Sequence, residues 1–252
     1  RGIYIEEEDS VMLESKNREA AAGKINVAVI LLRHLSNFTD FNVLERDERV
    51  HLYYTNNVDD ITKADIILLP GSKNTLDDLY ELRRNGVAQA ILKASQEGAT
   101  VMGICGGYQM MGLEVRDPEG VEGNVRMLPG LGLLPVITTM QGDKVTRQVE
   151  FTFDGTEALC KGYEIHMGRT VPAEGSPPSP FNQLADGRED GYQDKQKKCL
   201  GTYIHGILDN QPFIDFLLAP YIGKLGQQTF DYTAFKEEQY DKLAEHVRKH
   251  IN

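Results

Sequence analysis

The residues around Cys105 form a pattern that can expose a nucleophilic side chain. Cys105 ends the apolar stretch 100–104, is followed by Gly106 and Gly107, and has Gly103 two residues before it. A sharp turn from a strand into a helix pushes its central side chain out of the sheet and needs neighbours without a Cβ. Such a turn also puts the thiol at a helix N-terminus, where the dipole favours thiolate. The pattern fits a cysteine nucleophile, and it also fits a core cysteine, because glycine-flanked turns occur without chemistry.

A cysteine nucleophile needs a base, and the chain has six histidines, which are His34, His51, His166, His205, His246 and His250. His205 follows the apolar run 199–204 and precedes Gly206, which puts its imidazole at a strand end, as for Cys105. His166 is the rival, and strand alternation puts it on the same face as Glu164. The pair at 246 and 250 has the spacing of zinc ligands but no evident third ligand, so exposed helix positions are predicted there. His205 is the predicted base.

The elements that must position these residues alternate between apolar runs and amphipathic stretches from Lys24 onward. This alternation is typical of a parallel sheet covered by helices. Strands are predicted at 25–32, 50–54, 65–69 and 100–105, and helices around 76–82 and 87–94. Binding sites in open α/β sheets form outside the carboxyl ends of strands. We therefore expect the Pro70-Gly71-Ser72 turn and Cys105 to border one crevice.

The later part of the chain has a different character. Segments 131–139, 144–153 and 162–170 are predicted strands, antiparallel and at one edge of the sheet. Segment 172–198 is rich in proline, glycine and charge, and a surface excursion is predicted for it. A further strand is expected at 199–204, and helices at 212–218 and 232–250. No internal repeat is found.

The composition of the chain limits the classes of protein to which it can belong. With 252 residues, of which 40% are hydrophobic, the chain can bury a substantial core. A net charge of −11 argues against a nucleic-acid or anionic-membrane partner. No stretch approaches the roughly 20 apolar residues of a membrane span, and no signal pattern opens the chain, so a cytoplasmic protein is expected. Three scattered cysteines without a C-x-x-C pair indicate neither disulfides nor a metal site.

Several segments together resemble a known family, the class I (triad-type) glutamine amidotransferases, and within it the cobyric acid synthase branch. They are Leu69-Pro70-Gly71-Ser72-Lys73-Asn74-Thr75, Gly103-Ile104-Cys105-Gly106-Gly107-Tyr108-Gln109-Met110, Pro129-Gly130-Leu131-Gly132-Leu133-Leu134, Gly162-Tyr163-Glu164-Ile165-His166-Met167-Gly168-Arg169-Thr170 and Gly201-Thr202-Tyr203-Ile204-His205-Gly206. The resemblance implies an α/β, flavodoxin-like fold with a mostly parallel central sheet flanked by helices and an antiparallel edge.

The resemblance also implies roles for individual residues. Cys105 attacks the side-chain amide of glutamine, and His205 acts as its base. The tetrahedral oxyanion needs N–H donors, which the Gly71 region and the turn at Gly106 can supply. Gln109 matches a position that contacts the bound glutamine. His166 is interpreted as structural or as lining the glutamine site.

The chain departs from the wider superfamily at His205-Gly206-Ile207, because the usual glutamate two residues after the histidine is replaced by isoleucine. Isoleucine cannot orient an imidazole by hydrogen bonding. The site is therefore either a Cys/His dyad, as in the cobyric acid synthase branch, or takes an acid from elsewhere. Glu164 and Asp209 are the candidates for that acid.

No phosphate-binding loop of the G-x-x-x-x-G-K-[ST] type occurs. The prediction is that residues 1–23 are the remnant of an interdomain linker and 24–252 the glutaminase domain, with no cofactor of its own. By resemblance, an N-terminal synthetase domain, absent from this chain, uses ATP and Mg²⁺ and binds the corrinoid.

The reaction implied for the whole protein is amidation of adenosylcobyrinic acid a,c-diamide at carboxylates b, d, e and g, in cobalamin biosynthesis. The chain alone is expected to show weak or no glutaminase activity. The alternatives are the glutaminase of cobyrinic acid a,c-diamide synthase or of a cell-wall lipid amidating subunit, or a degenerate, non-catalytic domain.

Overall fold

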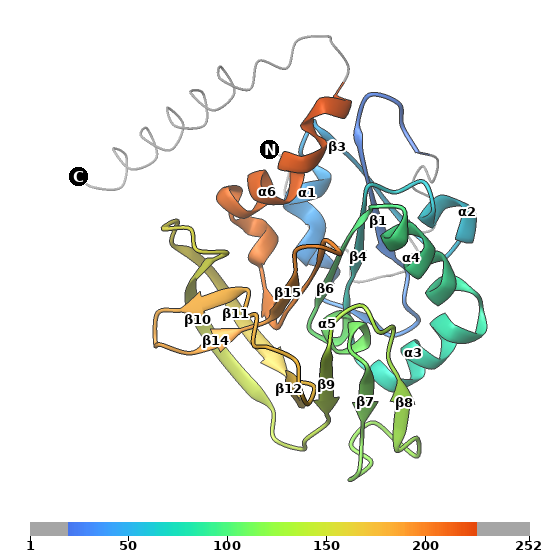
Figure 1. The fold of residues 1–252 in the computed structure, drawn as a ribbon, viewed down its shortest axis with the longest axis vertical. Helices are drawn as coiled ribbons and strands as arrows, with labels where there is room; N and C mark the ends of the chain where they lie inside the picture. The colour runs from blue at the N-terminus through green and yellow to red at the C-terminus, as the bar shows by residue number, and fades with distance from the viewer. Residues whose placement is uncertain (1–19, 226–252) are drawn as a thin grey trace, which may run out of the picture.

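The computed structural model describes residues 20–225 and is built on a six-stranded central sheet (Figure 1). Its strands run in the order β15 (Tyr192–Asp194), β16 (Cys199–Thr202), β6 (Thr100–Ile104), β4 (Ile66–Leu69), β1 (Ile25–Ile30) and β3 (Val50–Thr55). All neighbours are parallel except β15 and β16. The predicted mostly parallel sheet is confirmed, together with the strands predicted at 25–32, 50–54, 65–69 and 100–105, and one of its edges is antiparallel.

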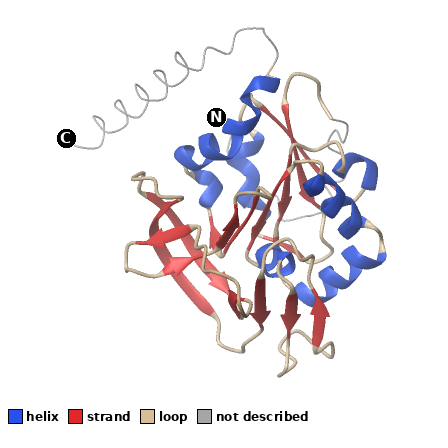
Figure 2. Cartoon of the chain, viewed as in Figure 1, coloured by secondary structure: helices blue, strands red, loops and turns tan. Residues whose placement is uncertain are grey.

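Helices cover both faces of this sheet, as Figure 2 shows in blue. One side carries α2 (Val58–Ile61), α3 (Thr75–Arg84), α4 (Val87–Gln96) and α5 (Gly106–Met111), and the other carries α1 (Asn42–Glu45), α6 (Gln211–Leu218) and the 3₁₀ turns η2 (Phe38–Phe41), η3 (Ile207–Asp209) and η4 (Ala219–Lys224). Successive residues of β1 alternate between two cores: Ala28 and Ile30 pack with α3 and α4, while Val27 and Val29 pack with α1 and α6. This period of two is what a sheet buried on both faces requires.

The remaining strands form smaller sheets of their own. A five-stranded antiparallel sheet has the order β14 (Glu189–Asp190), β13 (Asn182–Leu184), β10 (Val145–Phe153), β11 (Cys160–His166) and β17 (Ile204–His205), and a four-stranded one the order β12 (Arg169–Pro172), β9 (Val136–Thr139), β7 (Glu114–Arg116) and β8 (Met127–Pro129). A short ladder joins β2 (Leu35–Ser36) to β5 (Gly71–Ser72).

Two sequence predictions need correction here. The strands predicted at 131–139, 144–153 and 162–170 do not extend the central sheet but lie in the two smaller sheets, and the last of them breaks at Gly168, whose φ is 94°. The antiparallel edge is instead β15, which belongs to the predicted surface excursion 172–198. Strands of two or three residues are too short for their alternation to stand out from a polar loop.

The predicted strand 199–204 changes sheets along its length. It pairs with β6 as far as Thr202 and then, from Ile204, joins β11 of the antiparallel sheet. This switch leaves His205 just beyond the carboxyl end of β16, beside the end of β6. The fold thus places the predicted base next to the predicted nucleophile.

The predicted helix 232–250 and most of the predicted linker 1–23 lie outside the described residues. Between residues 20 and 225, no helix has the length and apolar character needed to cross a membrane.

Candidate active site

The turn at Cys105 joins β6 directly to α5 and has a strained backbone. Cys105 has φ 52° and ψ −112°, which is unusual for a residue with a side chain. Its N–H donates to the Thr202 carbonyl at 2.8 Å and its own carbonyl accepts from Gln109 N at 3.0 Å. Because the surrounding hydrogen bonds hold the residue from both sides, the strain persists and the thiol is presented at the end of the strand.

The glycines around Cys105 are required by close packing, as the sequence predicted. A Cβ at Gly103 would lie 2.6 Å from the Tyr108 nitrogen, and a Cβ at Gly107 would lie 2.0 Å from the Leu69 carbonyl oxygen. Both distances are far below van der Waals contact with backbone atoms that cannot move away. The turn therefore forms only with glycine at these positions.

His205 is buried beside the thiol, with 1% of its surface exposed. Its Nδ1 lies 2.7 Å from Asp40 Oδ2, and its ring makes a hydrogen bond with the side chain of Cys105. The other Asp40 oxygen accepts from Gly206 N at 3.1 Å, and the Tyr163 ring stacks on the imidazole at 5.3 Å. Since Asp40 takes Nδ1–H, Nε2 is left for the sulfur.

The charges around His205 set its protonation state. Burial acts to lower its pKa, but the hydrogen bonds to Asp40 and Cys105 and the charges of these two groups outweigh burial and raise the pKa to about 10. The imidazole is therefore protonated at neutral pH. An imidazolium in contact with a thiol stabilises the thiolate, the form that attacks carbonyl carbon.

The acid that orients His205 is neither of the two sequence candidates. Glu164 forms ion pairs with Arg147 at 3.0 Å and Arg188 at 3.1 Å. Among the described residues, no hydrogen bond joins Glu164 or Asp209 to His205, and the carboxylate that does so is Asp40, 165 positions away in sequence. The open choice between a dyad and an acid from elsewhere is resolved in favour of the second.

Sequence reasoning missed Asp40, although one signal for it existed. The residue lies in the polar stretch Ser36-Asn37-Phe38-Thr39-Asp40 that follows β1, at the carboxyl edge where sites form in such sheets. No spacing relative to Cys105 or His205 distinguishes it from other polar residues in loops at that edge.

Gly71 and Gly106 bring two backbone segments together at the nucleophile. A Cβ at Gly71 would lie 3.3 Å from Cε1 of His205, and a Cβ at Gly106 would lie 2.9 Å from the Ser72 nitrogen. The turn after β4 thus packs on both the imidazole and the start of α5. That N–H groups of this turn and of α5 stabilise an oxyanion stays a prediction.

Gln109 lies in the wall of the same pocket, but its amide is already bonded within the protein. Its Nε2 donates to the Met167 carbonyl at 2.8 Å and the Tyr203 hydroxyl at 3.2 Å, and its Oε1 accepts from Thr75 Oγ1 at 3.0 Å. These bonds fix α5 to the chain between β11 and β12. The direct contact of Gln109 with glutamine stays a prediction.

The resulting pocket has a volume of about 320 Å³, and Cys105, His205, Gln109 and His166 all contribute to its wall. This size suits a small polar metabolite. Within residues 20–225, no cluster of three or more His, Cys, Asp or Glu side chains is arranged to hold a metal ion.

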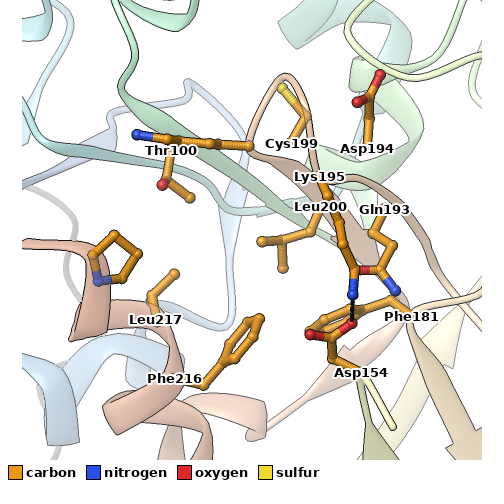
Figure 3. A pocket seen from close by; sticks show the side chains of 12 residues that line it. Thr100, Asp154, Phe181, Gln193, Asp194, Lys195, Cys199, Leu200, Phe216 and Leu217 are labelled. Carbon is orange, nitrogen blue, oxygen red and sulfur yellow. Dashed lines mark ion pairs between the residues drawn. The ribbon is translucent and has the colours of Figure 1, made fainter.

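A second cavity, of about 200 Å³, lies at the opposite end of β6 and β16 (Figure 3). Cys199, Phe181, Phe216 and Leu217 give it a mainly apolar wall, and an ion pair of 2.6 Å between Lys195 and Asp154 lies at one side. No histidine lines it. The Cys199 sulfur lies 3.6 Å from Ser95 Oγ of α4, in the core on one face of the sheet, whereas Phe181 and Leu217 belong to the core on the other face.

Comparison with known proteins identifies a family and a set of close relatives. A model of the CobB/CobQ-like glutamine amidotransferase domain matches residues 26–213. A cobyric acid synthase of Bacteroides fragilis is 70% identical over 252 residues, covering 100% of this chain and 51% of the relative. A cobyric acid synthase of Parabacteroides distasonis is 56% identical over 254 residues with the same coverage of each. The chain thus spans about half the length of these relatives.

Two solved structures share the fold at low identity. The PurLQS structure from Thermotoga maritima matches with a TM-score of 0.56 and 18% identity, over 75% of this chain and 92% of that one. A glutamine amidotransferase crystal structure matches with a TM-score of 0.55 and 16% identity, over 77% and 97%. These likenesses bear on the fold, whose α/β architecture they share.

Proposed function

The chain belongs to the CobB/CobQ-like glutamine amidotransferase domain family, and on that basis we propose that it hydrolyses glutamine through a thioester on Cys105. The observation that carries the proposal is the contact of Cys105 with His205, whose far nitrogen is held by Asp40 at 2.7 Å. Such a line of thiol, imidazole and carboxylate is the general arrangement of an activated nucleophile.

The first half-reaction forms the thioester. The Cys105 thiolate adds to the amide carbon of glutamine, and the negative charge moves to the carbonyl oxygen, facing the N–H groups contributed by the Gly71 turn and Gly106. The tetrahedral adduct then collapses, the C–N bond breaks, and protonated His205 gives its proton to the departing nitrogen. Ammonia leaves, and His205 is neutral.

The second half-reaction restores the enzyme. Neutral His205 takes a proton from water as the oxygen adds to the thioester carbonyl. The C–S bond breaks, glutamate leaves, and the site returns to thiolate and imidazolium. Asp40 takes no proton in either half; it holds the imidazole in one orientation and stabilises its positive charge.

For the whole protein we propose the cobyric acid synthase reaction, in which this ammonia amidates the b, d, e and g carboxylates of adenosylcobyrinic acid a,c-diamide. Support comes from relatives of that name, which are about twice as long as this chain. The additional length has room for a synthetase domain that binds ATP, Mg²⁺ and the corrinoid. We expect the protein to act in the cytoplasm, where the Cys105 thiol stays reduced.

The proposal is tested with 6-diazo-5-oxo-L-norleucine, a glutamine analogue whose diazoketone carbon is protonated and then alkylates a thiolate with loss of dinitrogen. The full-length protein is treated with the analogue, digested and examined by mass spectrometry. We expect one adduct, on Cys105, and none on Cys199. The Cys105→Ser variant should take up no label and release no glutamate, whereas Cys199→Ser should match the wild type. An unlabelled Cys105 would favour the degenerate, non-catalytic reading.

A further inference from the structure

A buried carboxylate lies where the chain passes from the central sheet into the antiparallel sheet. Asp190 belongs to β14, within the predicted surface excursion 172–198, yet only 6% of its surface is exposed. It stands directly opposite Asn182 of β13. The proposed mechanism gives it no role. Because a buried carboxylate is costly unless hydrogen bonds compensate it, its partners indicate what it holds in place.

Both oxygens of Asp190 accept hydrogen bonds. Oδ1 accepts from Tyr203 N at 3.0 Å, and Oδ2 accepts from Asn182 Nδ2 at 2.8 Å and from Thr202 Oγ1 at 2.5 Å. Thr202 Oγ1 itself accepts from Ile204 N at 3.0 Å and from Asn182 Nδ2 at 2.9 Å. Because its two lone pairs are taken, its single hydrogen is left for Asp190. Burial raises the pKa of Asp190, and the bonds from its three donors oppose the rise.

The segment that Asp190 holds is the bend at residues 202–204, where the chain leaves β16 and enters β17. Thr202 is the last residue paired with β6, and Ile204 is the first paired with β11. Tyr203, between them, belongs to neither strand. The side chain of Asp190 therefore fixes the backbone at the one residue that the two sheets leave between them.

Each end of this bend holds one member of the reactive pair. The Thr202 carbonyl accepts from Cys105 N at 2.8 Å and so supports the strained backbone of the nucleophile. The residue after Ile204 is His205, whose imidazole contacts the side chain of Cys105. The conformation of the bend thus sets where the imidazole stands relative to the thiol.

We propose that Asp190 is a positioning residue for the reaction: by holding the bend at residues 202–204, it keeps the imidazole of His205 within hydrogen-bond reach of Cys105. Asp190 binds the bend and acts on both side chains through the backbone. The inference rests on the proposed glutaminase function and adds a residue on which the contact between thiol and imidazole depends. Since a displacement of about 1 Å can lower a rate about a hundredfold, loss of these bonds should affect catalysis as well as stability.

The first test is Asp190→Asn in the full-length protein. An asparagine side chain has one acceptor group and one donor group, so it can satisfy either Tyr203 N or the pair Thr202 and Asn182, but not both. We expect glutaminase kcat to fall about ten- to a hundredfold, with KM for glutamine changed by less than about threefold.

Two further readouts report on the reactive pair itself. The alkaline limb of the rate profile should move down by about one to two pH units in Asp190→Asn, because His205 loses the contact that helps to raise its pKa to about 10. Alkylation of Cys105 by iodoacetamide at pH 7 should slow at least about tenfold, because the imidazolium no longer stabilises the thiolate.

A double variant provides the matched rescue, because Asn182 and Asp190 are cross-strand partners. Asn182→Asp combined with Asp190→Asn exchanges acceptor and donor between the two positions. The amide at position 190 then accepts from Tyr203 N and donates to the carboxylate at position 182, which also accepts from Thr202. We expect kcat to recover at least about fivefold relative to Asp190→Asn alone, since the two changes are coupled.

Tyr221→Phe is the control for a loss of stability alone. The Tyr221 hydroxyl lies 2.9 Å from Thr100 N and 2.7 Å from Thr100 Oγ1, at the amino end of β6. Its removal should lower the midpoint of urea denaturation and leave kcat, the pH profile and the alkylation rate unchanged. If Asp190→Asn behaves in the same way, Asp190 is merely structural and the inference is overturned.

Variants of Thr202 give a second route if Asp190→Asn does not fold. Thr202→Val removes the hydroxyl that bonds to Asp190 at nearly constant volume, and Thr202→Ser keeps it. The valine variant should reproduce the fall in kcat and in the alkylation rate, and the serine variant should stay within about threefold of the wild type. Equal rates for the two variants overturn the inference.

The alkylation rate separates the inference from the function beneath it, because alkylation needs no glutamine. If wild-type Cys105 is alkylated rapidly but no glutamate is released, the proposed function fails, and the effect of Asp190→Asn on alkylation still decides the inference. If glutamate is released and Asp190→Asn alters neither kcat, the pH profile nor alkylation, the inference alone fails. A double variant as slow as Asp190→Asn also overturns it, because the pattern of donors and acceptors would then not hold the bend.

Discussion

A cysteine lies at each end of the paired strands β6 and β16, and the two cysteines have different surroundings. At the carboxyl end, Cys105 lies in a pocket with His205, on a backbone with φ 52°. At the amino end, Cys199 begins a regular strand and lines the apolar cavity of Figure 3. Its sulfur lies 3.6 Å from Ser95 Oγ and 3.4 Å from the Lys197 carbonyl.

The difference shows that a buried thiol at a strand end is not sufficient for chemistry. Burial raises the pKa of Cys199 and the Ser95 hydroxyl only partly opposes it, so that thiol stays protonated and inert. Cys105 instead contacts an imidazole that is itself held by a carboxylate. The neighbours of each sulfur therefore predict a reactive thiol at Cys105 and a packing role for Cys199.

The largest effect that would sharpen this contrast is expected from Asp40→Asn. Asparagine cannot stabilise the imidazolium, so glutaminase turnover should fall by about two to four orders of magnitude. The pKa of His205, about 10 in the wild type, should fall toward its ordinary value, and the alkaline limb of the rate profile should move to lower pH with it. Turnover measured from pH 6 to 10.5 checks both expectations.

Asp209→Asn is the matched control, because Asp209 lies near Gly206 without bonding to the imidazole. It should leave turnover and the pH profile close to those of the wild type. The sign of the stability effect provides a further check. A pKa raised in the folded state stabilises the fold below the ordinary value of 6.5, and this contribution is lost as the pH rises through about 10. The stability difference between wild type and Asp40→Asn should therefore shrink over that range; a constant difference would contradict the ion pair.

The next largest effect is expected in the alkylation rates of Cys105 and Cys199. At pH 7, Cys105 should react with iodoacetamide at least about tenfold faster than Cys199, because Cys105 contacts the protonated His205, whereas burial outweighs the neighbours of Cys199 and raises its pKa. Quantitative mass spectrometry of the two tryptic peptides gives both rates in one sample, and Cys160, also buried and with its pKa raised to about 11 by burial, serves as an internal reference. Equal rates for Cys105 and Cys199 would remove the distinction between the two cavities.

Local sequence signals were enough to predict the reactive end of the sheet. Glycines at 103, 106 and 107 are needed because backbone atoms approach them closely, and the apolar runs before Cys105 and His205 are strands that end side by side. Signals of this kind lie within a few residues of the feature they specify. For that reason the proximity of Cys105 and His205 and the strands of the central sheet could be predicted without coordinates.

The parts that escaped prediction depend on contacts between distant segments. Asp40 meets His205 across 165 positions, and only the paired strands β1, β4, β6 and β16 bring the two together. Strand β15 has only three residues, and it forms the edge of the central sheet because it pairs with β16. No pattern within residues 172–198 predicts this pairing. Sequence periodicity predicts elements, whereas the choice of sheet and partner depends on packing among all of them.

The smallest catalytic effect is expected at the apolar cavity. Phe216 is half-buried there and its ring meets that of Phe153 edge to face at 5.4 Å. Phe216→Ala removes this packing and should lower the free energy of unfolding by about 1–3 kcal/mol, less than for a fully buried phenylalanine. Glutaminase turnover and Cys105 labelling at 25 °C should stay at wild-type levels, because the cavity lies at the far end of the strands that carry the site. Urea denaturation measures the change in the free energy of unfolding, and the labelling assay measures the reactivity of Cys105. A variant that is as stable as the wild type but has lost activity would show that the amino-end cavity takes part in the reaction.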